Sequence, residues 1–159
     1  MSHVENLMID ELILQQIHQA AKFGAETNIN ICDQLLPTLL VATPKEIEIY
    51  GLTTEKEYLP MVILDTLEKR QAQAYALIVE AWSTPFLERA AQYNYRVRDM
   101  APDDRDEVVQ IIVAERNNEL VRYSVAKIKI SSTGNRHLAE WVENEPDGTA
   151  CGAFVITRW

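Results

Sequence analysis

The first part of the chain carries an apolar stripe with helical spacing. Isoleucines recur every fourth residue from position 9 to position 17, while polar side chains occupy most positions on the other side. Ser2 and Glu5 have the spacing of a capping box, and Gly24 suits the left-handed residue that follows a helix. The pattern predicts an amphipathic helix over residues 5–23, which we expect to pack on a sheet of the same protein.

The next two apolar segments are short and separated by a turn signal. Residues 38–43 and 47–51 flank Pro44-Lys45, and their β-rich or alternating composition predicts a hairpin. A broad apolar face then follows Pro60, which is suited to the first turn of a helix. We expect this second helix to end near Arg70 and to cover the sheet.

The second half of the chain is patterned mainly as strands. Residues 74–82 are apolar at both parities, which is typical of a central strand, and residues 108–114 and 120–130 predict a long hairpin through Asn117-Asn118. Turn signals then introduce two further strand segments, His137 to Glu143 and Cys151 to Thr157.

This order of elements predicts an α+β fold in a single domain over residues 1–159. We expect a mostly antiparallel sheet of about five to seven strands packed by two helices, in the order α-β-β-α-β-β-β-β-β. Hydrophobic residues make up 47% of the chain, which is enough for a real core.

Charge and composition exclude several classes of function. The net charge is −9, and residues 1–60 hold nine acids against three lysines, so a phosphate backbone would be repelled and no nucleic acid is expected. There is no apolar run of roughly 20 residues and no basic leader, so we expect no membrane span and a cytoplasmic location. Cys32 and Cys151 are interpreted as buried reduced thiols.

One long connection, from Ser83 to Asp106, concentrates the unusual chemistry. It is longer than a structureless loop normally is, so it is either helical near residues 85–92 or functional. As a partner-binding loop or lid, its guanidinium groups could grip a carboxylate or phosphate; otherwise it is an internally ion-paired surface excursion. The candidate residues are Arg89, Tyr93, Tyr95, Arg96, Arg98 and Arg105.

A second candidate site is acidic. Glu80 ends an apolar strand, where its carboxylate needs a cation, and Asp103, Asp104 and Asp106 follow in the loop. Together these acids could bind Mg²⁺ as in a hydrolase or nuclease; alternatively Glu80 pairs with Arg105 and has only a structural role. Scattered His and Cys residues predict no structural metal site, and the scarcity of glycine predicts no nucleotide cofactor.

A limited resemblance accompanies these residues. Glu80-Ala81-Trp82, followed by Pro102-Asp103-Asp104-Arg105-Asp106-Glu107-Val108, resembles a pattern of small bacterial and phage-associated proteins of unknown function. The resemblance covers roughly Ala74 to Ile130. It implies a strand-loop-strand unit and a bacterial or phage setting.

The sequence favours a small binding or accessory protein, because no nucleophile, base and orienting residue cluster together. The expected partner is a protein or a small acidic ligand. An exposed helix stripe or an unpaired edge strand would also allow a homodimer. The alternative is a metal-dependent hydrolase or nuclease that uses Glu80 and the Asp103 to Asp106 cluster.

Overall fold

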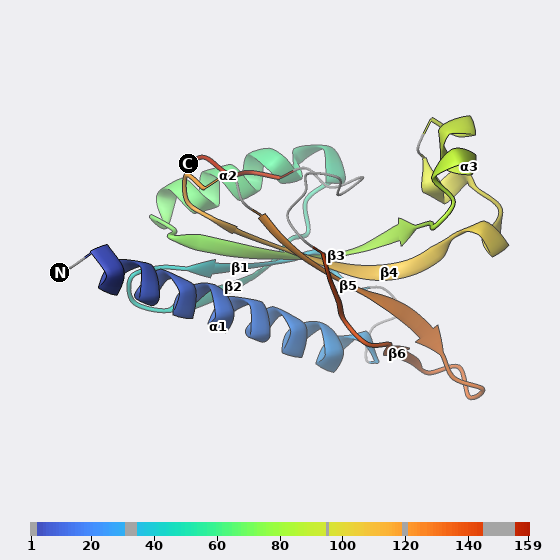
Figure 1. The fold of residues 1–159 in the computed structure, drawn as a ribbon, viewed down its shortest axis with the longest axis horizontal. Coiled ribbons are helices and arrows are strands. Elements are labelled where there is room, and N and C mark those ends of the chain that lie inside the picture. Colours follow the sequence, from blue (N-terminus) through green and yellow to red (C-terminus); the bar gives the residue numbers. More distant parts are fainter. Residues whose placement is uncertain (1–2, 31–34, 95, 119–120, 145–154) are drawn as a thin grey trace.

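The protein has three layers, with a curled antiparallel sheet between two helices (Figure 1). The computed structural model describes residues 3–30, 35–94, 96–118, 121–144 and 155–159. The strands are β1 (Thr38–Ala42), β2 (Ile47–Gly51), β3 (Ala74–Ser83), β4 (Asp106–Glu115), β5 (Val121–Ile130), β6 (Arg136–Leu138) and β7 (Val142–Asn144). The strand order is β2-β1-β3-β4-β5-β6, with β7 also paired to β5. The predicted α+β class is confirmed.

Helix α1 (His3–Ile29) crosses one face of the sheet and is longer than predicted. It continues through Gly24, so the expected helix end at that glycine is wrong. The reason is burial: Ile17, Ala21, Ala25 and Ile29 extend the same stripe every fourth residue, and all four are buried. Their packing outweighs the roughly 1 kcal/mol that a glycine costs inside a helix. Ser2, the expected cap, lies outside the described residues.

Helix α2 (Leu59–Lys69) covers the opposite face, as predicted. Pro60 lies in its first turn and Arg70 is its C-terminal cap residue. Leu59, Ile63 and Leu67 are buried at spacings of four residues. A short 3₁₀ turn (Lys56–Tyr58) leads into the helix.

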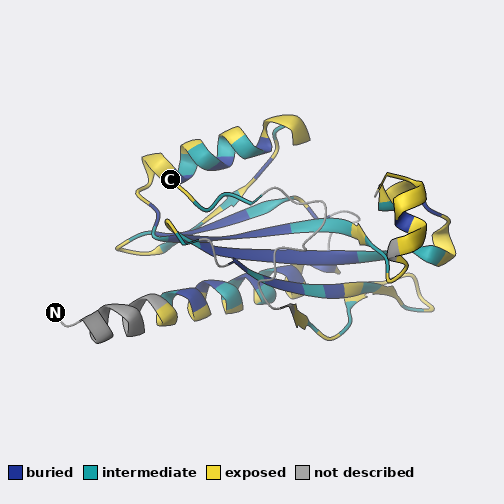
Figure 2. Ribbon diagram, turned by 45° about the horizontal axis from the view of Figure 1, so that its top comes forward, coloured by how far each residue is buried: buried dark blue, intermediate teal, exposed yellow. Residues whose placement is uncertain are grey.

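The sheet has a core on each face because its central strands are apolar at both parities. Ala76 and Ile78 of β3 belong to the cluster under α1, whereas Tyr75 and Leu77 belong to the cluster under α2. Burying a side chain of this size contributes roughly 1.5–3 kcal/mol. The two clusters explain why the central strands are dark along most of their length in Figure 2.

The end of the chain departs from the predicted meander. The expected strand His137 to Glu143 is split into β6 and β7, which pair with different parts of β5. The segment 151–154 lies outside the described residues, and residues 155–159 are not a strand. They pack instead against the α2-side cluster, through Val155, Ile156 and Trp159.

No helix in the described part of the chain is both long and apolar enough to cross a membrane.

Candidate functional site

The connection between β3 and β4 projects from one end of the sheet, far from α2 and the start of α1 (Figure 1). We define the tip as residues 84–105 together with Trp82 at its base. It contains α3 (Leu87–Gln92) and two 3₁₀ turns, Val97–Asp99 and Pro102–Asp104. The helical alternative near residues 85–92 is therefore present, and the described part of the chain has three α-helices instead of the two in the predicted order.

The tip is folded upon itself. Ala90 and Met100 are almost fully buried within it. Arg89 Nη1 donates to Asp104 Oδ1 at 2.6 Å, and the Thr84 hydroxyl donates to the Asp104 carbonyl at 2.5 Å. These contacts fasten the start of the connection to its end. Part of the tip is therefore the internally ion-paired excursion predicted from the sequence, with Arg89 and Asp104 as its ion pair.

Three large aromatic side chains remain exposed on the tip. Trp82, Phe86 and Tyr93 have relative exposures of 41%, 40% and 41%. The Arg105 guanidinium lies 4.2 Å from the centre of the Trp82 ring, and that of Arg89 lies 4.4 Å from the Phe86 ring. The tip thus presents aromatic rings with cations stacked on them.

The remaining arginines of the predicted loop differ in their environment. Arg105 Nη1 donates to the Arg98 carbonyl, while Arg105 Nε is buried without a hydrogen-bond partner among the described residues. Arg96 and Arg98 are exposed, and their side chains have no acidic partner in the described part of the chain. Tyr95 lies outside the described residues. Two cations of the tip are therefore open to a binding partner.

The structure separates the acids of the proposed metal site. In the β3–β4 register Glu80 is opposite Val109, which belongs to the α1-side cluster. Asp106 is opposite Ser83, which has an odd number like Tyr75 and Leu77 of the α2-side cluster. The Asp106 side chain therefore lies on the α2 face. Because these two side chains leave the sheet on opposite faces, they do not converge on one ion.

Each of these acids, apart from the exposed Asp103, has a cation of its own. Glu80 Oε1 accepts from Arg136 Nη2 at 2.6 Å and from the Leu35 amide at 2.7 Å. Asp104 pairs with Arg89, and Asp106 pairs with Lys127 at 3.4 Å. Arg105 stacks on Trp82, so the expected Glu80–Arg105 pair is replaced by Glu80–Arg136. Among the described residues no group of three or more His, Cys, Asp or Glu is placed to hold a metal.

A polar cluster between α1, β5 and β7 was not predicted as a unit. His18 Nε2 and Glu143 Oε2 both hydrogen bond to the Ser124 hydroxyl, and Lys22 pairs with Glu143. An ionised Glu143 can only accept, so Ser124 donates to it and accepts from the His18 Nε2–H. Ser124 is fully buried, which denies a substrate access to its hydroxyl.

The charges of this cluster fit a structural role. Burial lowers the pKa of His18, and the neighbouring Lys22 lowers it further. Burial opposes the ionisation of Glu143, but hydrogen bonds from Lys22 and Ser124 outweigh it and lower the pKa of this carboxyl. The contacts of His18 with Ser124 and Glu143 are those of a hydrogen-bonded structural histidine.

A hollow of about 670 Å³ lies at the end of β3 and β4 opposite the tip. The Gln73 side chain lines it, and Gln73 Oε1 is buried with no hydrogen-bond partner among the described residues. Arg116 also lines it, with Nε donating to the Trp159 carbonyl at 2.9 Å. The other lining residues are Pro44, Leu67, Glu68, Gln71 and Trp159.

Comparison with known proteins finds no matching family model, no similar curated protein and no similar solved structure. The resemblance to bacterial and phage-associated proteins therefore stays a prediction, and the function is argued from the site alone.

Proposed function

We propose that this chain is a binding or accessory protein that holds a partner protein with its tip. The observation that carries the proposal is the set of three half-exposed aromatic side chains, Trp82, Phe86 and Tyr93, on a folded projection. Tryptophan, tyrosine and arginine dominate the energetics of protein interfaces. Exposed aromatic rings on one short connection are typical of such a surface.

The shape of the tip favours a protein over a small molecule. Small ligands are usually enclosed in concave pockets, whereas the tip projects from the end of the sheet (Figure 1). Rings on a projection suit a groove in another protein. The exposed Arg96 and Arg98 then favour acidic side chains at the rim of that groove.

The tip is also suited to binding because it is ordered before a partner arrives. The Arg89–Asp104 ion pair and the two stacked guanidiniums hold the Phe86 and Trp82 rings in place. Preorganisation reduces the side-chain entropy lost on association, which is about 0.5–1.5 kcal/mol for each immobilised side chain. The metal-dependent alternative lacks such support, because Glu80 and Asp106 leave opposite faces of the sheet.

Site-specific photocrosslinking in cells tests this assignment. A benzophenone amino acid replaces Tyr93 on the tip or, as the matched control, Tyr58 near α2, which is 48% exposed. We expect one discrete protein adduct from position 93 and none of that mass from position 58. Charge reversal by Arg96→Glu and Arg98→Glu should weaken the adduct at position 93.

Two results would count against the proposal. Equal adduct patterns at positions 93 and 58 would show that the tip binds no specific partner. Calorimetric binding of Mg²⁺ that disappears in Glu80→Gln would instead support the hydrolase or nuclease.

A further inference from the structure

The two edges of the sheet differ in how they are protected. One edge consists of the three-residue strands β6 and β7, which pair with separate parts of β5. Short edge strands offer little template for another chain. The other edge is β2, which has five residues without proline or lysine and pairs with β1 along its whole length. It is the edge suited to adding a strand.

The hydrogen-bond pattern shows which groups of β2 face outward. Two bonds flank the β1–β2 ladder in the same register, from Thr43 N–H to the Glu46 carbonyl and from Leu52 N–H to the Pro37 carbonyl. Bonded pairs alternate with unbonded pairs in an antiparallel ladder, so Glu48 and Tyr50 bond to β1. The N–H and C=O groups of Ile47, Ile49 and Gly51 consequently point away from the sheet.

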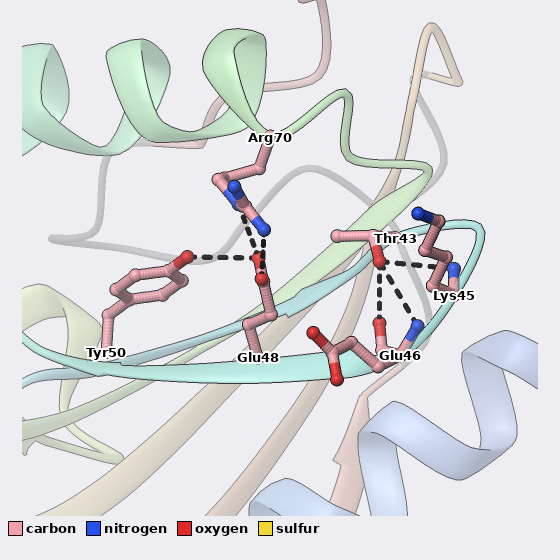
Figure 3. Close-up of polar contacts among 6 residues, drawn as sticks. All are labelled: Thr43, Lys45, Glu46, Glu48, Tyr50 and Arg70. Carbon is pink, nitrogen blue, oxygen red and sulfur yellow. Dashed lines mark hydrogen bonds and ion pairs between the residues drawn. The ribbon is translucent and has the colours of Figure 1, made fainter.

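The side chains of β2 alternate in the same manner. Glu48 and Tyr50 point toward α2, where both Nε and Nη2 of Arg70 donate to Glu48 and the Tyr50 hydroxyl donates to Glu48 Oε1 at 3.0 Å (Figure 3). The acidic group on this edge is therefore already neutralised within the chain. It places no uncompensated charge against a second strand.

The opposite face of the edge is apolar and exposed. Ile49 has a relative exposure of 70%. Leu36, which is also exposed, lies over Gly51, since a Cβ added to that glycine would be 3.1 Å from Leu36 Cδ2. A strand added to β2 would cover this apolar surface as well as the outward N–H and C=O groups, which have no partner among the described residues.

We propose that β2 pairs with β2 of a second copy of this chain, antiparallel and centred on Ile49. In this register Ile49 opposes Ile49 of the other copy and Ile47 opposes Gly51, so every outward N–H and C=O finds a partner. Tyr50 then lies opposite Glu48 of the other copy. The result is a two-fold symmetric dimer with one continuous sheet.

Neighbouring registers fit less well. Pairing centred on Glu48 would move Gly51 opposite Lys45, which precedes the start of β2. Pairing centred on Tyr50 would move Ile47 opposite residue 53, which is beyond the end of β2. Of these three registers, only self-pairing about Ile49 uses the whole strand.

Hydrogen exchange on the unmodified protein gives the sharpest test. In the dimer the amides of Ile47, Ile49 and Gly51 become protected as protein concentration rises, while Glu48 and Tyr50, already bonded to β1, change little. Sedimentation over about two decades of concentration should show a monomer–dimer equilibrium over the same range. A dimer whose three outward amides exchange at a concentration-independent rate would overturn the proposal, as would a monomer at every concentration.

A matched pair of variants provides the second measurement. Ile49→Lys should give a folded monomer, because the side chain is exposed and a lysine on an edge blocks strand addition. Ile130→Lys is the control: Ile130 is an isoleucine on the same face of the sheet, 66% exposed, at the end of β5. The control should remain dimeric. Equal dimer formation by the two variants would contradict the β2 interface whatever the oligomeric state of the native chain.

Discussion

Tyr75 fastens the last described residues of the chain to the centre of the sheet. Its side chain is 2% exposed, and its hydroxyl donates to the Ile156 carbonyl at 2.7 Å and accepts from the Ile156 N–H at 3.0 Å. Its ring lies 5.5 Å from that of Trp159. Tyr75→Phe keeps the ring but leaves both backbone groups of Ile156 without this partner. We expect a loss of about 2 kcal/mol of unfolding free energy at neutral pH, because each unpaired group costs roughly 1–3 kcal/mol and Ile156 is only half-buried.

The same substitution should change how stability depends on pH. Burial raises the pKa of Tyr75 to about 12. The folded protein keeps the phenolic proton at a pH where the unfolded chain, with a pKa of 10.0, releases it, so stability is lost as pH rises from 10 toward 12. At pH 11 this loss amounts to about 1.4 kcal/mol, the value of one pKa unit. Tyr75→Phe has no proton to release at this position and should not show this part of the loss.

Urea unfolding followed by circular dichroism at pH 7, 9 and 11 measures both effects. The difference in unfolding free energy between the native chain and Tyr75→Phe should shrink by about 1.4 kcal/mol between pH 7 and pH 11. Tyr58→Phe, which alters an exposed tyrosine, is the control and should differ little from the native chain at any of these pH values. A difference for Tyr75→Phe that stays constant with pH would refute the reasoning.

Three further outcomes follow from the polar contacts. Because the folded-state pKa of His18 is lowered below 6.5, stability should fall as pH drops below 6.5, and His18→Gln should reduce this fall in urea titrations at pH 5 and 7.5. Glu80→Ala should lower the unfolding free energy by about 3 kcal/mol in the same assay, because Arg136, whose side chain is 14% exposed, loses its carboxylate partner. The double variant Glu80→Met, Arg136→Met should lower it less. Gln73→Met should leave the melting temperature unchanged or raise it, since it removes a buried carbonyl that lacks a partner; a clear decrease would show that this oxygen is normally bonded.

Much of the fold could be predicted from local patterns. Apolar residues at both odd and even positions identified β3 as a central strand, and Pro60 marked the first turn of α2. The end of α1 was predicted wrongly because a glycine was taken as a stop signal, although the buried stripe continues through Ala25 to Ile29. Tertiary packing decided that boundary, and local propensity did not.

The candidate site was harder to predict because ion pairs depend on strand order and on the face of the sheet. Arg136 reaches Glu80 from β6, 56 residues further along the chain, and no local spacing connects the two. Arg105 is nearer in sequence but is stacked on Trp82. The exposed aromatic rings of the tip were only partly anticipated, since Tyr93 was named as a candidate and Trp82 and Phe86 were not.

The register of β3 gives the tip a particular mechanical anchorage. β3 pairs with β1 only as far as Ile78, and β4 pairs with β5 only as far as Val108, opposite Ala81. Because β3 and β4 pair with each other as far as Ser83, a short two-stranded arm extends beyond the body of the sheet. Tension applied to the arm along its length would load the β1–β3 and β4–β5 ladders in shear, with many hydrogen bonds sharing the force. A sideways load would instead bend the arm beyond Ala81 and Val108, where only β3 and β4 pair. A partner that pulls lengthwise would therefore meet a stiff support, and one that pushes from the side would meet a compliant hinge.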